Sequence, residues 1–298
     1  MAHITENDIL FWAVETGNQP VLEALYRSKK VMDIHKARDK YDRTLLMRAA
    51  ESGQDKIVSF LLDKVQMHVN GVNDKQETAL MWGATHPNHK VVSRLLAHWA
   101  DVEQADNRGV TPLMVAAMNG HVKTIDELLN SGAKIDKSDK QGKTALIYAI
   151  QSKNLIVVEH LLSKGADVNK QDMALNTPAM HATQAFMCSF FSEISDINVD
   201  FRNIKDILSV LVKYGANLNA QDINGNTILH HEVLRSQIFI PFLMKNGAKK
   251  DVPNYDGKLP EDVYYDVFHK ECSSLFDKPY LIAHYDKKSF NHYKDYSK

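Results

Sequence analysis

Threonine recurs along this chain at an almost constant interval. Thr44, Thr78, Thr111, Thr144 and Thr177 are separated by 34, 33, 33 and 33 residues. A fixed period of this length is typical of arrays in which one small structural unit is repeated and packs only against its neighbours. The threonine period therefore predicts an elongated stack of similar units.

The stretch from 106 to 138 shows what one unit contains. Thr111 suits the N-cap of a helix, and Pro112 follows at the first helical position, where proline is tolerated. Gly120 lies at the corner before a second helix, and Gly132 supplies the left-handed residue that commonly ends one. Such a unit has too little apolar surface to fold alone, so it needs copies on both sides.

Two segments of the chain resemble the ankyrin repeat: TPLMVAAMNGH at 111–121 and LLSKGADVNKQD at 161–172. The resemblance extends over residues 8–263. It implies an all-α solenoid of about seven helix-turn-helix units with terminal caps. It also implies a non-enzymatic scaffold that binds another protein in a concave groove formed by the turn tips and the first helices. The drifting repeats are similar to those of ankyrin-repeat effectors of intracellular bacteria.

One slot of the repeat departs from the family pattern. Ankyrin repeats commonly carry histidine after T-P-L, where it bonds to the backbone of a neighbouring unit. Here histidine fills this slot only at His230, and the other units carry Met47, Met81, Met114, Ile147 and Met180. Methionine fills gaps but cannot donate a hydrogen bond. We therefore expect the same fold with fewer hydrogen bonds between units.

The array is predicted to occupy residues 1–267, with an N-terminal cap at 1–38. Thr227 follows Thr177 by 50 residues, 17 more than a period of 33, so the sixth unit contains an insertion at about 186–202. Its apolar first part is predicted to lengthen the first helix, and SDINVDF at 195–201 is predicted to be a loop. Both a functional loop and a tolerated insertion fit this pattern. Residues 268–298 form an aromatic-rich extension that is predicted to pack on the last repeat.

Composition narrows the functional classes. The formal net charge is −1, which gives no argument for nucleic-acid binding, and no apolar run is long enough to span a membrane. Two cysteines make no disulfide framework and indicate a reducing compartment. We expect a cytoplasmic monomer or, for an effector, a protein delivered into the cytosol of a host cell.

No pattern of catalytic or metal-binding residues stands out. His181 and Cys188 lie seven residues apart, too far along a helix for the hydrogen bond that activates a nucleophile. His86 and His89 lack cysteine or carboxylate partners at zinc-site spacing. We therefore expect no catalytic residue, no cofactor and no metal.

Position in the repeat selects the candidate residues for partner binding. The turn tips provide Tyr41, Arg43, Lys75, Glu77, Arg108, Val110, Lys140 and Lys143, and the exposed side of the first helices provides Met118, Asn119 and Gln151. Cations outnumber anions in this set, which predicts an acidic or mixed partner surface.

A second function is suggested by the C-terminal segment at 259–298. Leu259–Val263 followed by Val267 and Phe268 resembles the start of an F-box, which would make the chain an adaptor for ubiquitin ligase machinery. The same residues fit a C-terminal cap, because DGKLP at 256–260 repeats the D-G-x-x-P opening of a unit. Agreement with the repeat phase favours the cap.

Overall fold

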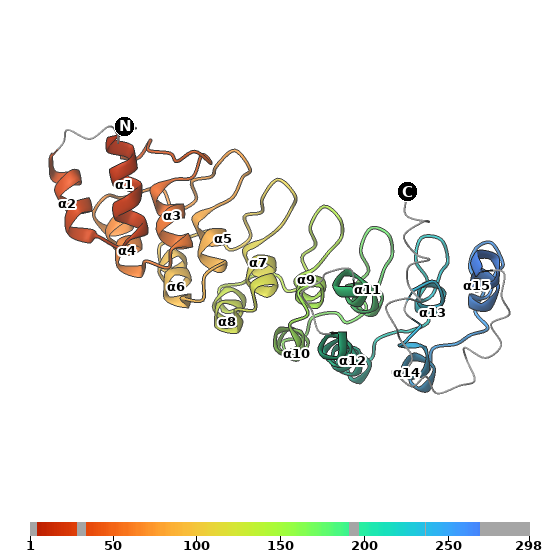
Figure 1. The fold of residues 1–298 in the computed structure, drawn as a ribbon. Coiled ribbons are helices and arrows are strands. Elements are labelled where there is room, and N and C mark those ends of the chain that lie inside the picture. Colours follow the sequence, from red (N-terminus) through yellow and green to blue (C-terminus); the bar gives the residue numbers. More distant parts are fainter. Residues whose placement is uncertain (1–4, 29–33, 191–196, 236, 269–298) are drawn as a thin grey trace.

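The computed structural model describes residues 5–28, 34–190, 197–235 and 237–268 of the chain. Within these ranges fifteen helices form two parallel rows (Figure 1). The first row consists of α1 (Glu6–Glu15), α3 (Leu45–Glu51), α5 (Ala79–Ala84), α7 (Pro112–Asn119), α9 (Ala145–Gln151), α11 (Pro178–Phe190), α13 (Ile228–Val233) and α15 (Pro260–Phe268). The second row consists of α2 (Gln19–Ser28), α4 (Asp55–Asp63), α6 (His89–Ala97), α8 (Val122–Asn130), α10 (Leu155–Ser163), α12 (Ile197–Lys213) and α14 (Ile240–Lys245).

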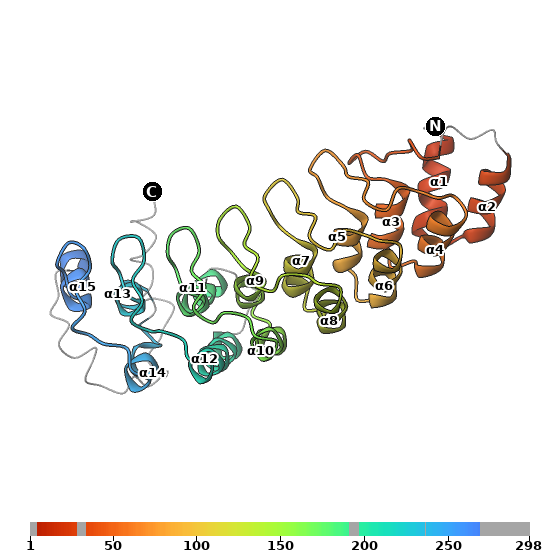
Figure 2. The same cartoon turned by 180° about the vertical axis from the view of Figure 1, so that it is seen from behind.

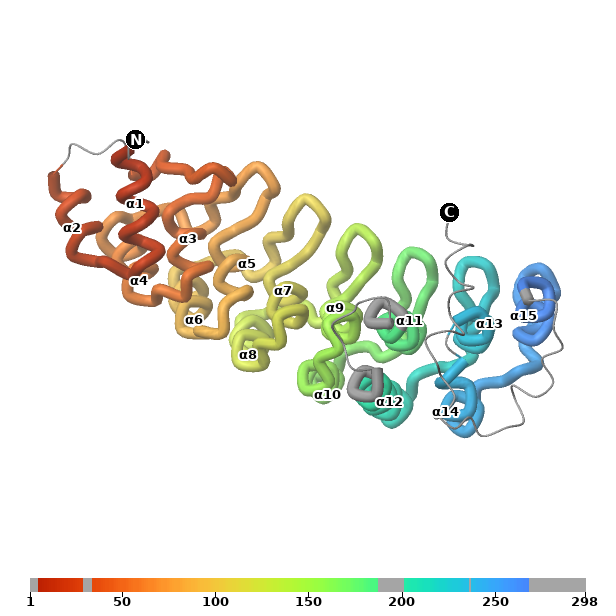
Figure 3. Tube along the Cα trace, viewed as in Figure 1, coloured from red at the N-terminus to blue at the C-terminus, as the bar shows by residue number. Residues whose placement is uncertain are grey.

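Long loops connect each pair of helices to the next and project on one side of the array. In both views they lie at the edge of the first row and away from the second row (Figures 1 and 2). The trace runs from one end to the other, so each unit lies between its predecessor and its successor (Figure 3). Apart from an isolated bridge between Val72 and Thr78, the described residues contain no β structure. The all-α solenoid is thus confirmed.

The repeated threonines begin the first helices, as their spacing predicts. The hydroxyl of Thr111 accepts the amide of Met114 at 3.4 Å, and Thr44 accepts that of Met47 at 3.1 Å. Such a cap satisfies one of the amides that a helix N-terminus leaves without a partner. The same contact recurs at Thr78, Thr144 and Thr177.

The core is continuous along the stack, because both helices of a unit bury one side against the next unit. In the unit of α7 and α8, Leu113, Met114, Ile125 and Leu128 are almost fully buried. Neighbouring units contribute equivalent leucines and isoleucines to one cluster. Removal of a unit from the middle would therefore expose apolar surface on both sides.

Hydrogen bonds of two asparagines, which we call the asparagine seam, join the loops that follow the second helices of neighbouring units. Asn169 accepts the amide of Asn217 at 2.7 Å and donates to the carbonyl of Gly215 at 3.1 Å. Asn219 makes the equivalent contacts with Lys249 and Gly247 at 2.7 and 2.9 Å. Each asparagine therefore fixes the loop of the following unit through both ends of its amide.

The insertion in the sixth unit takes a helical form on both sides. Helix α11 has 13 residues and α12 has 17, whereas the other helices after α2 have 6 to 9. The predicted loop at 195–201 is wrong for residues 197–201, which form the first turn and more of α12. Two helices that pack against each other can continue together beyond the length of a normal unit, which overrides the polar local sequence.

The C-terminal end of the described chain keeps the repeat phase. Helix α15 begins at Pro260 and lies beside α13 in the first row, where a cap is expected (Figure 1). The predicted packing of the 268–298 extension concerns residues 269–298, which lie outside the described ranges, as does most of the F-box-like segment. None of the described helices is both long and apolar enough to cross a membrane.

Candidate functional site

Every turn tip is built around one aspartate or asparagine. Its Oδ1 atom accepts the backbone amides of the second and fourth residues that follow, as Asp106 does from Arg108 at 2.8 Å and Val110 at 2.9 Å. This local bonding lets a short polar side chain hold a tight turn without secondary structure. We name each tip by this residue: Asp39, Asn73, Asp106, Asp139, Asp172, Asp222 and Asn254.

Backbone hydrogen bonds connect consecutive tips. The first residue after the turn residue donates its amide to the second residue of the preceding tip. Lys140 donates to Arg108 and Met173 donates to Gln141, both at 2.9 Å. The further links are Asn107 to Lys75 at 2.9 Å, Ile223 to Ala174 at 3.0 Å and Tyr255 to Asn224 at 3.1 Å. The tips from Asn73 to Asn254 therefore form one continuous edge, which we call the tip ladder.

Most of the predicted binding residues are accessible on or beside this ladder. Tyr41 is 57 % exposed at the Asp39 tip, and Met118 is 46 % exposed at the end of α7. The other side chains divide into exposed and half-buried ones. Exposed are Lys75, Arg108, Asn119, Lys140 and Gln151; half-buried are Glu77 and Lys143.

Two predicted residues, Arg43 and Val110, are buried, with exposed fractions of 6 % and 3 %. The expectation that their side chains face a partner is therefore wrong. Both are the fourth residue after the turn residue, where the chain turns back toward the first helix and the side chain lies beneath the tip. Their amides bind Asp39 and Asp106, so both residues support the turn.

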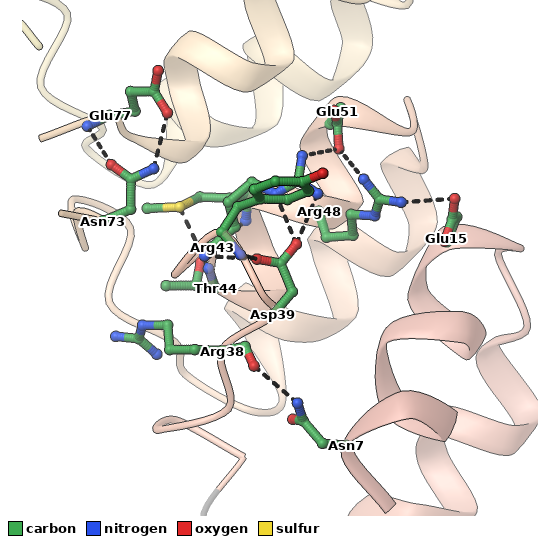
Figure 4. A network of polar contacts seen from close by, with 12 residues as sticks. Asn7, Glu15, Arg38, Asp39, Arg43, Thr44, Arg48, Glu51, Asn73 and Glu77 are labelled. Atoms are coloured by element: carbon green, nitrogen blue, oxygen red, sulfur yellow. Dashed lines mark hydrogen bonds and ion pairs between the residues drawn. The ribbon is translucent and has the colours of Figure 1, made fainter. Parts of the chain in front are cut away.

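Arg43 lies in a network of ion pairs at the N-terminal end of the array (Figure 4). Its guanidinium contacts Asp39 and Glu51, each at 2.7 Å, and stacks 5.0 Å from the ring centroids of Tyr41 and Trp82. Burial alone would raise the pKa of Asp39, but hydrogen bonds from Arg43 and from the Tyr41 amide outweigh it and lower that pKa. Planar stacking and two charge-assisted bonds are the surroundings that arginine suits best.

Arg48 extends this network to the N-terminal cap. It bonds to Glu51 within α3 and to Glu15 at the end of α1, the latter at 2.8 Å. The amide of Asn7 in α1 donates to the carbonyl of Arg38 at 2.8 Å (Figure 4). The ion pair between Arg48 and Glu15 therefore fastens α1 to the second unit in addition to the apolar core, and the Asn7 bond holds α1 to the end of its own cap.

Three histidines occupy the C-terminal units. His230 Nδ1 accepts the amide of Thr227 at 3.0 Å, and its Nε2 donates to the carbonyl of Lys258 in the next unit at 3.0 Å. His181 and His231 each lie 2.9 Å from the carboxylate of their own tip, Asp172 and Asp222. Burial lowers the pKa of all three imidazoles and outweighs the opposite effect of the nearby Asp172 and Asp222 carboxylates, so it favours the neutral form.

Methionine at the position that His230 occupies, three residues after the capping threonine, accepts a hydrogen bond only from its own unit. The sulfur of Met47 accepts the Thr44 amide at 3.4 Å, and Met114 does the same for Thr111. Among the repeat slots of the described residues, only His230 bonds to the backbone of a following unit. The expected loss of hydrogen bonds between units is confirmed at this slot, and the tip ladder and the asparagine seam supply the links that remain.

Sequence reasoning missed a group of exposed apolar side chains. Met173 is 71 % exposed, Ile223 58 % and Tyr255 70 %, and all three occupy the first position after their turn residue. Leu175 is 41 % exposed on the Asp172 tip. Comparison of this one position across all units would have found them, because the earlier units carry lysine, aspartate or asparagine there.

The described residues contain no cluster of three or more histidine, cysteine or carboxylate side chains that could hold a metal ion. His86 accepts the amide of Asn88 at 3.0 Å, a contact that supports the corner of its unit. A hollow of about 530 Å³ lies between α2, α4 and α6, with Tyr26 and Phe60 among its lining residues, and is therefore on the opposite row from the predicted surface.

Comparisons with known proteins agree with this architecture. The structure superposes on the ankyrin repeat domain of Bcl-3, a member of the IkappaB protein family, with a TM-score of 0.63 and 22 % identity over 79 % of this chain and 97 % of that one. It also superposes on the ankyrin repeat domain of human ASB11, with a TM-score of 0.59 and 23 % identity over 74 % and 89 % of the two chains.

Sequence comparison gives the family directly. No curated protein matches the sequence significantly. The family model for ankyrin repeats in three copies matches residues 10–106 and 80–172, which together make up more than half of the chain. The chain therefore belongs to the ankyrin-repeat family.

Proposed function

We propose that this chain is a non-enzymatic scaffold that binds a partner protein along the tip ladder and the adjoining ends of the first helices. Ankyrin repeats are protein–protein interaction modules, which supports the general class. The observation that carries the specific face is the ladder itself. It presents exposed side chains from six linked tips at fixed spacing, and such an extended edge suits a protein better than a small molecule.

The residues proposed for contact are the accessible members of the predicted set. They are Tyr41, Lys75, Arg108, Met118, Asn119, Lys140 and Gln151, with Glu77 and Lys143 at the margin. Aromatic, methionine and arginine side chains are enriched in protein interfaces, which singles out Tyr41, Arg108 and Met118. The lysines and Arg108 favour an acidic partner, mainly through the rate of association.

Combined replacement of Arg108, Met118 and Lys140 by alanine tests this face. We expect capture of partner proteins from a eukaryotic lysate, measured by mass spectrometry, to be lost while the circular dichroism of the helices is unchanged. Replacement of Arg27, Lys90 and Ile156 provides the control, because these exposed side chains lie on second-row helices. If the wild type and the tip variant capture the same proteins equally well, the tip ladder is not the binding face.

Oligomeric state, localisation and nucleic-acid binding are separate expectations. We expect a monomer in the cytoplasm, or in the cytosol of a host cell, that does not bind nucleic acid. Nothing in the comparisons supports the ubiquitin-ligase adaptor, and the described part of its segment, 259–268, follows the repeat phase. We therefore propose a cap for this segment.

A further inference from the structure

The chemistry of the tip ladder changes along its length. At the Asp106 and Asp139 tips the exposed side chains include Arg108 and Lys140, with Lys143 half-buried beside them. At the next three tips the first position carries Met173, Ile223 and Tyr255, whose side chains are 58 to 71 % exposed. Three large apolar side chains on consecutive tips are more than the scattered exposed residues of an ordinary surface.

The cationic and apolar tips are directly joined. The amide of Met173 donates to the carbonyl of Gln141 at 2.9 Å, which places the first apolar tip immediately after the last cationic one. The ladder continues from Ala174 to Ile223 at 3.0 Å and from Asn224 to Tyr255 at 3.1 Å, even though an insertion separates the first pair in sequence. A ligand that lies along the ladder would therefore meet both kinds of surface in a fixed order.

Leu175 adds a fourth exposed apolar side chain to these tips. It occupies the third position after the turn residue, and its φ angle of +60° belongs to the common turn geometry. The equivalent position is glycine in four other tips (Gly109, Gly142, Gly225 and Gly257) and a polar residue in two, Asp42 and Gln76, with φ angles of +58° and +64°. Leu175 is therefore the one apolar residue among these seven positions, and it is 41 % exposed.

We propose that the partner contributes a two-part segment, acidic over Arg108, Lys140 and Lys143 and apolar over Met173, Ile223 and Tyr255. The acidic part faces the N-terminal half of the array and the apolar part faces its C-terminal half, where Leu175 lies on the same tip as Met173. This inference rests on the proposed function and specifies the chemistry and direction of the ligand. The cations steer and orient the segment, and the apolar side chains hold it.

A second copy of the chain does not fit this surface. One twofold pairing places the Asp106 and Asp139 tips of the two copies opposite each other, and another places them opposite the apolar tips. In both, Lys140 faces cationic or apolar side chains, and burial of its charge there is unfavourable. Charge complementarity therefore selects a different molecule that carries carboxylates beside large apolar residues.

Selection of peptides by the full chain from a random phage-displayed library tests the chemistry without knowledge of the partner. We expect the selected peptides to carry acidic residues followed or preceded, in one consistent order, by large apolar residues. Their affinity is expected to fall by about tenfold or more for the combined change Met173→Ser and Ile223→Ser. Peptide affinity is also expected to fall for Arg108→Ser combined with Lys140→Ser. It should then no longer depend on salt concentration, because the screened charges have been removed.

Two further variants make the test specific. Ile156→Ser is the matched control, because Ile156 is 70 % exposed on α10 in the second row, and we expect unchanged affinity. Leu175→Asn places a residue that tolerates the left-handed conformation, so the melting temperature should not fall although peptide affinity does. Such a result separates loss of contact from loss of folding.

The opposite results overturn the inference. One such result is a library that yields no binding peptide or only peptides without the two-part pattern. Another is a peptide affinity that does not change with Met173→Ser and Ile223→Ser. A wild-type dimer in light scattering that becomes monomeric with Met173→Ser and Ile223→Ser would identify a second copy as the occupant. If captured protein still depends on Arg108, Met118 and Lys140 but not on the apolar tips, the proposed function stands and only the two-part ligand fails.

Discussion

Two arginines pair with the aspartate of their own tip, yet their surroundings differ. The Arg43 side chain is 7 % exposed and is enclosed by Asp39, Glu51 and Trp82. The Arg108 side chain is 75 % exposed and contacts Asp106 at 3.0 Å. An exposed ion pair gains little net free energy, whereas removal of one partner from a buried network leaves the other charges without compensation.

Arg43→Ala is therefore expected to lower the free energy of unfolding by about 2–4 kcal/mol. Arg108→Ala is expected to lower it by less than about 1 kcal/mol, because solvent already screens that pair. Urea denaturation of both variants measures the difference. Equal losses would show that the network around Arg43 contributes no more than an exposed pair.

At the scale of an element, the tip ladder depends on close approach between neighbouring loops. Gly142 has a φ angle of +81°, and a Cβ atom at this position would lie 2.5 Å from the Met173 amide nitrogen. The backbone of Asp172 is also within 2.8 Å of that point. A side chain there would push the Asp172 tip away and lengthen the hydrogen bond between Met173 and Gln141.

Gly142→Ala is expected to lower the free energy of unfolding by about 2–4 kcal/mol, from left-handed strain and displacement of the next tip. Gly165→Ala is the matched control, because Gly165 has a φ angle of +91° and no atom within 4 Å of an added Cβ. It should lose only about 1–2 kcal/mol. Hydrogen exchange at the Met173 amide checks the mechanism, since protection should fall in the first variant and persist in the second.

The sequence predicts an element well when the contacts that form it join residues that are close in sequence, and poorly when they join distant ones. The helix starts at Thr111 and its equivalents were predictable, because cap and amide are three residues apart. The burial of Arg43 and Val110 was not, since it depends on how a tip folds over the helix that follows it. The helical state of 197–201 was also missed, because it depends on the pairing of α11 with α12.

The candidate surface was predictable in the same uneven way. Repeat phase places Lys140 and Met118 on the accessible side, because their units match the consensus most closely. Met173, Ile223 and Tyr255 stand at a tip position that the consensus motifs do not include. Their exposure follows from the common turn geometry, so a comparison by position would have included them.

At the scale of the whole array, the histidines of the described residues whose pKa is lowered are unevenly placed. His181, His230 and His231 lie in the sixth and seventh units, and burial lowers the pKa of each. In the third unit burial also lowers the pKa of His86, whereas hydrogen bonds to Arg94 and Asp63 raise that of His98. Within the described ranges, three of the four histidines with a lowered pKa therefore lie in the sixth and seventh units.

A histidine whose pKa is lower in the folded than in the unfolded state binds fewer protons when folded. Its contribution to stability is complete above the unfolded pKa of about 6.5 and is lost as the pH falls through the folded pKa. We expect the urea midpoint to fall below pH about 6.5, with exchange protection lost first in α11 to α15. Uniform loss along the array, or first loss at α1 to α4, would contradict this placement.

The distribution of indole rings has a practical consequence for such experiments. Trp12, Trp82 and Trp99 are the three tryptophans of the chain, so all of them lie within its first third. Trp99 is 87 % exposed and Trp12 51 %, while Trp82 lies beneath the Arg43 guanidinium. Emission from these rings monitors the N-terminal units alone, whereas ellipticity averages over every helix. Divergence between the two optical signals would thus reveal which end of the stack melts first, without any label.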